Sequence, residues 1–136
     1  MKKLFLFFSL ALTLLFTGCG NDQKYITALK SVVVEEVLNS KTTEELAANA
    51  IGLAMDQKVE MNQLKWKVDG ETKEGKMVVA EYNNYKMYFP TVKNGDYVEY
   101  TLDKVYIITA SNNKVTFGEL MYTDIVNGFA NIFEGK

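Results

Sequence analysis

The chain has 136 residues, 15 basic against 17 acidic side chains, and a formal net charge of −2. It contains one cysteine, no histidine and no arginine, so every basic residue is a lysine. These absences exclude histidine-based acid–base and metal chemistry, guanidinium recognition of phosphates, thiolate zinc sites and an internal disulfide. The acidic balance disfavours nucleic-acid binding. The composition predicts no metal and no cofactor.

The N-terminus has the composition of an export signal. Lys2 and Lys3 precede an uncharged apolar run over residues 4–16. A helix that spans a bilayer needs about 20 apolar residues, so this run is too short to cross a membrane. A short apolar core behind two lysines and ahead of small residues is typical of a secretory signal peptide.

The motif after this run, Phe16-Thr17-Gly18-Cys19, resembles the lipobox of bacterial lipoproteins, in which leucine is commoner than phenylalanine at the first position. The resemblance implies that Cys19 carries a diacylglyceryl group and becomes the first residue of the mature protein. It implies a signal peptide over residues 1–18, a lipidated N-terminus and short tether over 19–23, and one domain over 24–136. A secretory signal that leaves a free thiol and an uncleaved anchor are the alternatives.

A lipid anchor on Cys19 implies a position on the exported side of a membrane. Acyl chains stabilise such anchoring by about 0.8 kcal/mol for each buried methylene. Gly20 follows the cysteine where an aspartate would favour inner-membrane retention, so in a cell with two membranes the resemblance favours the outer one. In a cell with one membrane, the anchor lies in the outer leaflet of the cell membrane. Cleavage removes Lys2 and Lys3 and no acidic residue, which leaves a formal charge of −4.

Two helices are predicted at the start of the domain. Over residues 24–39, apolar side chains recur at spacings of three and four, as on a helix with one buried face. The β-branched run Val32-Val33-Val34 disfavours helix locally, and a short strand is the alternative there. Over residues 42–57, Thr42 and Glu45 form a capping box ahead of an alanine-rich apolar face.

After Val59 the apolar period changes to two, which predicts an antiparallel meander of four to six strands. Asn83-Asn84 predicts a tight turn. Asn94-Gly95 predicts a hairpin, because a type I′ turn needs positive φ at both central residues. The segment over residues 97–110 is predicted to form one bent strand or two. Strands are expected over residues 64–68, 77–82, 85–89, 97–110 and 114–117.

The C-terminal segment is predicted to be an amphipathic helix behind a second capping box, formed by Thr116 and Glu119. Its continuous apolar stripe predicts packing on the sheet. A helix that binds a partner or lies on a membrane is the alternative, although interfacial helices usually carry lysines and residues 119–135 contain none. The stripe consists of Phe117, Met121, Ile125, Phe129 and Phe133.

Two helices, an antiparallel sheet and a closing helix predict an α+β domain with one sheet face covered. This order of elements resembles small cystatin-like and NTF2-like folds of bacterial envelope lipoproteins, in which helices pack against a curved antiparallel sheet. Such a resemblance concerns the fold and carries no activity with it.

Tyrosines in the strand region form the first candidate site. On an exposed sheet face they stack on sugars or contact a protein partner, whereas the structural alternative is that tyrosine suits a half-buried pleated surface. Trp66, between Lys65 and Lys67, is predicted to belong to the core. The candidate binding face consists of Tyr85, Tyr88, Tyr97 and Tyr100.

Acidic residues form the second candidate set, because carboxylates act as general acids and bases or bind calcium. Asp69, Glu71 and Glu74 are close in sequence, but they lack the ligand spacing of an EF-hand loop and Lys73 lies among them. Solvated surface charge is the prediction for these residues, and no catalytic residue is assigned.

Three functional hypotheses follow. The leading one is a non-enzymatic, membrane-anchored envelope lipoprotein that binds a protein or a small ligand. The alternative is an accessory subunit of a membrane complex that docks through the C-terminal helix, and the third is a hydrolase that uses carboxylates alone. An open aromatic sheet face favours the first, an exposed apolar patch on the last helix favours the second, and facing carboxylates in a cleft favour the third.

Overall fold

The computed structural model describes residues 22–95 and 97–133, without the side chains of Glu36 and of residues 128–133. Cys19 and the signal-like segment before it lie outside this part of the chain. The helices are α1 (Asp22–Lys30), α2 (Thr43–Met55) and α3 (Phe117–Phe133), with short 3₁₀ helices η2 (Met61–Gln63) and η3 (Leu102–Lys104). The strands are β1 (Val33–Val37), β2 (Ser40–Thr42), β3 (Lys65–Glu71), β4 (Lys76–Tyr82), β5 (Tyr85–Pro90), β6 (Val92–Asn94), β7 (Tyr97–Glu99), β8 (Tyr106–Ile108) and β9 (Lys114–Thr116).

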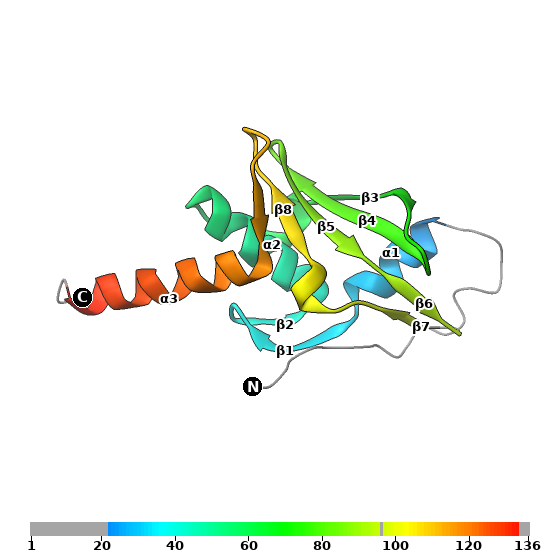
Figure 1. The fold of residues 1–136 in the computed structure, drawn as a ribbon, viewed down its shortest axis with the longest axis horizontal. Helices are drawn as coiled ribbons and strands as arrows, with labels where there is room; N and C mark the ends of the chain where they lie inside the picture. The colour runs from blue at the N-terminus through cyan, green and yellow to red at the C-terminus, as the bar shows by residue number, and fades with distance from the viewer. Residues whose placement is uncertain (1–21, 96, 134–136) are drawn as a thin grey trace.

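The main sheet has five antiparallel strands in the order β3-β4-β5-β8-β9 (Figure 1). Two separate hairpins, β1-β2 and β6-β7, complete the strand structure, and the second is an excursion between β5 and β8. Helices α1 and α2 precede the sheet and α3 follows it. The predicted α+β architecture, with an antiparallel meander and a C-terminal helix beside it, is confirmed.

One face of the sheet, called the inner face, carries the core. Cross-strand register places Trp66, Ala80, Met87 and Ile107 in one row on this face. Ala80, Met87 and Ile107 are fully buried and belong to the same hydrophobic cluster as the apolar residues of α1 and α2. The two N-terminal helices therefore cover the inner face and leave the opposite face, the outer face, to the solvent.

Trp66 packs against this core, as predicted. Its ring is stacked on that of Phe89 with 5.9 Å between centroids, and the Lys30 ammonium lies 5.9 Å from the centroid of its ring. The indole N–H is buried without a hydrogen-bond acceptor among the described residues. Trp66 is therefore a packing residue, not part of an exposed aromatic site.

The helix predicted over residues 24–39 is shorter than expected, because α1 ends at Lys30 and the chain then forms the β1-β2 hairpin. The β-branched valines, which lose rotamer freedom in a helix, form the strand that was the alternative. Leu38 (φ 52°) and Asn39 (φ 60°) make the tight turn. Positive φ is common for asparagine but rare for a bulky residue such as leucine, so the turn has no clear signal in the sequence.

Turn predictions later in the chain are confirmed with one shift of register. Asn83 (φ 53°) and Asn84 (φ 71°) join β4 to β5 in the expected left-handed conformation. The hairpin at Asn94-Gly95 also forms, but Asn94 is paired with Tyr97 in the ladder, so the turn begins one residue later at Gly95 (φ 63°). Residues 97–110 form β7 and β8 with the 3₁₀ helix η3 between them.

Helix α2 begins as predicted. The Thr42 hydroxyl accepts a hydrogen bond from the Glu45 N–H at 3.2 Å, while the Glu45 carboxylate accepts from the Lys41 N–H at 2.7 Å. The chain returns closely past the other end of the helix: a Cβ on Gly52 would lie 2.6 Å from the carbonyl oxygen of Gln57. Only glycine fits this approach. The buried residues of α2 are Thr43, Leu46, Ala47, Ala48, Ala50, Ile51 and Gly52.

Helix α3 also begins with the predicted capping box, in which the Thr116 N–H donates to the Glu119 carboxylate and the Glu119 N–H donates to the Thr116 hydroxyl. Phe117 and Leu120 are buried against the body beside the sheet. Beyond them the helix extends away from the body (Figure 1). The expectation that the whole stripe packs on the sheet is therefore wrong for Ile125, which is exposed, while the side chains of Phe129 and Phe133 lie outside the described part.

Candidate functional site

The four tyrosines predicted as a binding face do not lie together. Tyr100 is 3% exposed, and its hydroxyl and that of Thr43 are 2.7 Å apart. Burial raises the pKa of Tyr100 well above its usual range, and the hydrogen bond to Thr43 opposes this shift. Tyr100 therefore belongs to the core and its assignment to an exposed face is wrong.

The other three candidates lie in three different places. Tyr85 pairs with Tyr82 across the β4-β5 ladder and packs against the core on the inner face. Tyr97 is 44% exposed on the small β6-β7 hairpin. Tyr88 alone lies on the outer face of the five-stranded sheet. The predicted site is thus reduced to one of its members.

The outer face carries two rows of side chains that run across all five strands. The register gives Lys65, Glu81, Lys86, Ile108 and Lys114 as one row, and Lys67, Val79, Tyr88, Tyr106 and Thr116 as the next. Val79 is fully buried, although it lies outside the main hydrophobic cluster. Val79 is therefore covered and adds no exposed apolar area to this face.

Tyr106, which the predicted site omits, is the centre of this surface. Its ring is stacked on Tyr88, with 5.0 Å between centroids and 10° between planes. The Lys114 ammonium lies 4.5 Å from the centroid of the same ring, and it comes from β9, on the other side of β8 from Tyr88. Partial burial raises the pKa of Tyr106, and Tyr88 and Asp69 add to the shift.

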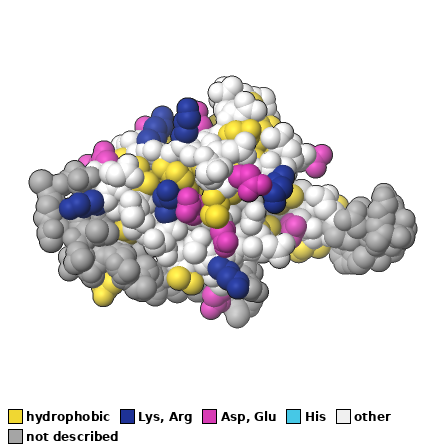
Figure 2. All heavy atoms as spheres, turned by 180° about the vertical axis from the view of Figure 1, so that it is seen from behind, with side chains coloured by type: hydrophobic (Ala, Val, Ile, Leu, Met, Phe, Trp, Pro, Cys, Tyr) yellow, Lys and Arg dark blue, Asp and Glu magenta, His cyan; other side chains and the backbone are white. Residues whose placement is uncertain are grey.

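Four lysines lie on the same sheet face as the tyrosine pair. Lys65, Lys67 and Lys114 are exposed and Lys86 is half-buried. None of the ion pairs found between described residues involves them, since those pairs join Lys30 to Glu44, Lys58 to Glu60, and Lys76 to both Asp22 and Glu71. Figure 2, which views the molecule from the side opposite to Figure 1, shows lysines, acidic groups and hydrophobic side chains interspersed over that side.

Helix α3 provides a second unusual surface. Tyr122, Ile125 and Val126 are 69%, 54% and 42% exposed, three of the largest exposures among apolar side chains in the described part. From Phe117 to Phe133 the charged residues are Glu119 and Asp124, with no lysine. The result is an apolar helix surface with acidic neighbours.

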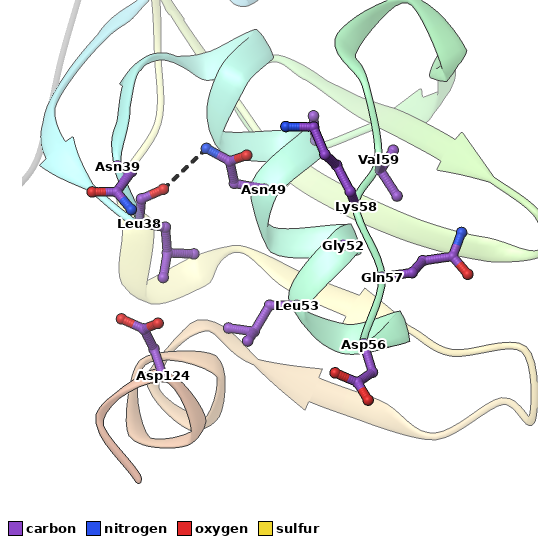
Figure 3. A pocket seen from close by; sticks show the side chains of 11 residues that line it. Leu38, Asn39, Asn49, Gly52, Leu53, Asp56, Gln57, Lys58, Val59 and Asp124 are labelled. Carbon is purple, nitrogen blue, oxygen red and sulfur yellow. Dashed lines mark hydrogen bonds between the residues drawn. The ribbon is translucent and has the colours of Figure 1, made fainter. Parts of the chain in front are cut away.

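A hollow of about 420 Å³ lies between the β1-β2 turn, α2 with its following loop, and α3 (Figure 3). The Asn49 amide donates to the Leu38 carbonyl at 3.0 Å and to the Ser40 hydroxyl at 2.8 Å, which fixes the turn at its rim. Asp56 and Asp124 line it from different elements. In the described ranges, no group of three or more acidic or cysteine side chains is placed to hold a metal ion.

Of the acidic residues singled out in the sequence, Glu71 contacts the Lys76 ammonium at 3.6 Å. Two other acids form similar ion pairs: Asp22 contacts the Lys76 ammonium at 3.9 Å, and Glu44 contacts that of Lys30 at 3.3 Å. These contacts lie at the start of α1 and between α1 and α2. They are consistent with surface charge, as predicted.

No helix in residues 22–95 and 97–133 combines the length and the apolar character needed to cross a bilayer. No family model, no curated protein and no solved structure matches this chain. The resemblance of the element order to cystatin-like and NTF2-like folds therefore stays a prediction.

Proposed function

We propose that this chain is a lipid-anchored, non-catalytic docking protein of the cell envelope that binds a protein partner through the free side of α3. The observation that supports this is the exposure of Tyr122, Ile125 and Val126 on a helix whose buried side chains in the described part, Phe117 and Leu120, both lie in its first turn. An exposed apolar patch on a helix marks an interaction surface. Of the hypotheses from the sequence, this geometry favours the accessory subunit over a binder that uses Tyr85, Tyr88, Tyr97 and Tyr100.

The charge of α3 selects among possible occupants of this surface. Its described acidic residues, Glu119 and Asp124, are not balanced by any lysine between Phe117 and Phe133. A second copy would bring acidic helices together, and interfacial membrane helices are usually rich in lysine. The partner that fits is a protein with an apolar helix or groove flanked by lysine or arginine.

The position of the tether supports a partner away from the anchored leaflet. Cys19 precedes Asp22 by three residues, which span at most about 10 Å. The start of α1 and the free end of α3 lie at opposite ends of the longest axis (Figure 1). A lipid on Cys19 would therefore hold one end of the molecule and leave α3 at the other.

A photocrosslinking amino acid placed at Ile125 in the full chain, in its own cells, tests the docking surface. Asn127 is the matched control, because it is exposed on the same helix, two residues from Ile125 on roughly the opposite side, and is not an i,i+3 or i,i+4 neighbour of any patch residue. We expect an adduct from position 125 and none from position 127. The adduct should map to an apolar partner segment flanked by basic residues, and Tyr122→Asp should abolish it.

Other outcomes of this experiment overturn the proposal. An adduct of twice the chain mass identifies a second copy as the occupant, and a lipid adduct identifies the bilayer. Equal adducts from positions 125 and 127, or none from either, show that the apolar side of α3 has no specific partner.

The anchor has its own test, the intact mass of the protein extracted from membranes. We expect a chain that begins at Cys19 and carries acyl groups. A mass that begins at Met1, or at Cys19 without acyl groups, contradicts the lipoprotein assignment. Cys19→Ser should release the protein from the membrane fraction, because the sulfur that receives the lipid is gone.

A further inference from the structure

The outer face of the five-stranded sheet is a second interaction surface, independent of α3, and we propose that it binds an acidic polysaccharide. By this we mean a chain of hydroxylated sugar rings that carry carboxylate groups. Four features of the face support this ligand: its lysines without ion pairs, its interleaved acids, its shielded tyrosine ring and its closed centre.

The cations give the face a charge opposite to that of the whole chain. Four lysines and two acidic residues, Asp69 and Glu81, lie at outer-face positions, whereas the chain as a whole has a net charge of −2. Strands are spaced about 4.8 Å apart, so the lysines of β3, β5 and β9 extend over about 20 Å. Charges spread over this distance suit several acidic groups of one extended polymer. The lysines are Lys65, Lys67, Lys86 and Lys114.

The acids on the face decide which kind of anion fits. Glu81 lies between Lys65 and Lys86 in the cross-strand register, without an ion pair of 4.0 Å or less to either. A polymer that presents only anionic groups and no donors here is repelled by this carboxylate. A uronic acid presents both kinds of group, because its carboxylate accepts from lysine while its hydroxyls donate to Glu81.

The tyrosine pair argues against nucleobases. Single-stranded nucleic acids are held by stacking of bases on open aromatic faces. One face of the Tyr106 ring is covered by Tyr88 and the other by the Lys114 ammonium. Both tyrosines keep part of their surface in solvent, and phenolic hydroxyls donate to and accept from sugar hydroxyls and carboxylates.

The shape of the face suits a polymer better than a small ligand. Since Val79 is fully buried, the face has no open hollow at this central position. At one end of the first row, a hollow of about 280 Å³ lies at the sheet edge, lined in part by Lys65, Glu81 and the Gln63 amide. Its mixture of charged and amide groups continues the pattern of the face.

Binding of alginate, a polyuronate, tests the proposal on the membrane-extracted protein in neutral detergent micelles at low ionic strength. Dextran, single-stranded DNA and anionic phospholipid vesicles are the comparison probes. We expect alginate to bind, dextran to bind more weakly, and added salt to weaken alginate binding.

Two double variants locate the binding surface. The double variant Lys86→Gln with Lys114→Gln should bind alginate about tenfold more weakly. Lys41→Gln with Lys58→Gln, which removes the same charge on the α2 side of the molecule, should change affinity less than about twofold.

Glu81→Gln separates an acidic sugar from a simple polyanion. Removal of this charge helps every polyanion through long-range electrostatics, but it also replaces the charged acceptor of the sugar hydroxyls with a weaker, neutral amide oxygen. We expect the ratio of alginate affinity to DNA affinity to fall in this variant. An unchanged or higher ratio overturns the assignment of the ligand class.

The remaining outcomes also count against the proposal. Absence of alginate binding overturns it, as does an equal loss of affinity in the two lysine double variants. Tighter binding to DNA or to anionic vesicles than to alginate replaces the polysaccharide with another class of polyanion. Unfolding curves that match those of the parent show that each variant is folded when its affinity is compared.

Discussion

Helices α2 and α3 begin with the same local chemistry and then meet opposite surroundings. In each, a threonine hydroxyl accepts a hydrogen bond of 3.2 Å from the N–H of the glutamate three residues later. Thr42 accepts from Glu45 in α2, and Thr116 accepts from Glu119 in α3. Helix α2 is then enclosed by α1, the β1-β2 hairpin and the sheet, whereas α3 is packed through its first turns and continues outward. A cap therefore fixes where a helix starts, and the rest of the chain decides whether its apolar side is covered.

The two helices are expected to contribute to different properties, α2 to the stability of the fold and α3 to interaction with a partner. Apolar area removed from water stabilises a fold by about 25 cal/mol for each Å², and the buried side of α2 supplies such area. The exposed side of α3 supplies none in the isolated chain. Matched substitutions in the two helices should therefore differ in their effect on stability.

The largest contrast is expected between Ile51→Ala in α2 and Ile125→Ala in α3. Ile51 is fully buried, so its truncation should lower the free energy of unfolding by about 2–5 kcal/mol. Ile125 is 54% exposed, and its truncation should change the free energy of unfolding by no more than about 0.5 kcal/mol. Urea unfolding followed by the fluorescence of Trp66, the one tryptophan, measures both. Equal losses would mean that α3 is packed in solution, and the contrast would fail.

In the second contrast, glycine-to-alanine substitutions in the two helices should change the free energy of unfolding in opposite directions. Gly52→Ala places a Cβ 2.6 Å from the Gln57 carbonyl oxygen and should destabilise the protein by about 1–3 kcal/mol. A Cβ on Gly118, in the first turn of α3, meets nothing closer than 3.9 Å, so Gly118→Ala should stabilise by up to about 1 kcal/mol through helix propensity. Thermal unfolding of the two variants beside the parent gives both signs. Stabilisation by Gly52→Ala would contradict the close approach of the chain to α2.

Alkaline pH should lower the stability of the fold through Tyr100, whose hydroxyl is hydrogen-bonded to Thr43 of α2. The pKa of Tyr100 is raised by burial above the ordinary value of 10.0. The unfolded chain therefore loses this proton first, so stability is retained below about pH 10 and falls above it by up to about 1.4 kcal/mol per pH unit.

Tyr100→Phe should reduce this alkaline decline and should cost about 1 kcal/mol near neutral pH, because the hydrogen bond to Thr43 of α2 is lost. The variant should still lose some stability at alkaline pH, because burial also raises the pKa of Tyr25. Tyr122→Phe on α3 is the control and should leave the curve of the parent unchanged. Urea unfolding at a series of pH values provides the test, and an unaltered decline in Tyr100→Phe would contradict it.

The smallest contrast concerns the two caps. Thr42→Ala should lower the free energy of unfolding by about 1 kcal/mol, because α2 is part of the cooperative core. Thr116→Ala removes the same kind of hydrogen bond, but its effect should appear mainly as faster amide hydrogen exchange within α3. Exchange rates for the two helices separate these outcomes. Equal acceleration throughout both helices in Thr116→Ala would show that α3 unfolds with the whole domain.

Features of the fold that depend on neighbouring residues could be predicted from the sequence. The caps at Thr42 and Thr116 and the turn at Asn83-Asn84 each follow from the chemistry of two to four adjacent residues. The extent of α1 could not, because the apolar spacing over residues 24–39 suits a helix while the β1-β2 hairpin depends on contacts with α2. The positive φ of Leu38 has no signal in the sequence.

The surfaces were harder to predict than the fold. Alternation along a strand divides tyrosines between two faces but does not tell which face the helices cover, so the pattern places Tyr100 on the candidate binding face and leaves Tyr106 out of it. The stack of Tyr88 on Tyr106 needs β5 and β8 to be neighbours, which follows only once the β6-β7 excursion is known. Periodicity predicts a stripe on α3, but it does not supply the element that covers it.

The placement of α1 and α3 at opposite ends of the longest axis has a mechanical consequence. Helix α3 has 17 residues and is about 25 Å long at 1.5 Å per residue, and its first turn is fixed to the body by the buried Phe117 and Leu120. If the chain is held by the segment before Asp22, the molecule acts as an arm with its apolar tip at a fixed radius. The apolar side of α3 is then confined to a thin layer at that distance from the attachment point. A partner in this layer meets a high effective concentration of α3.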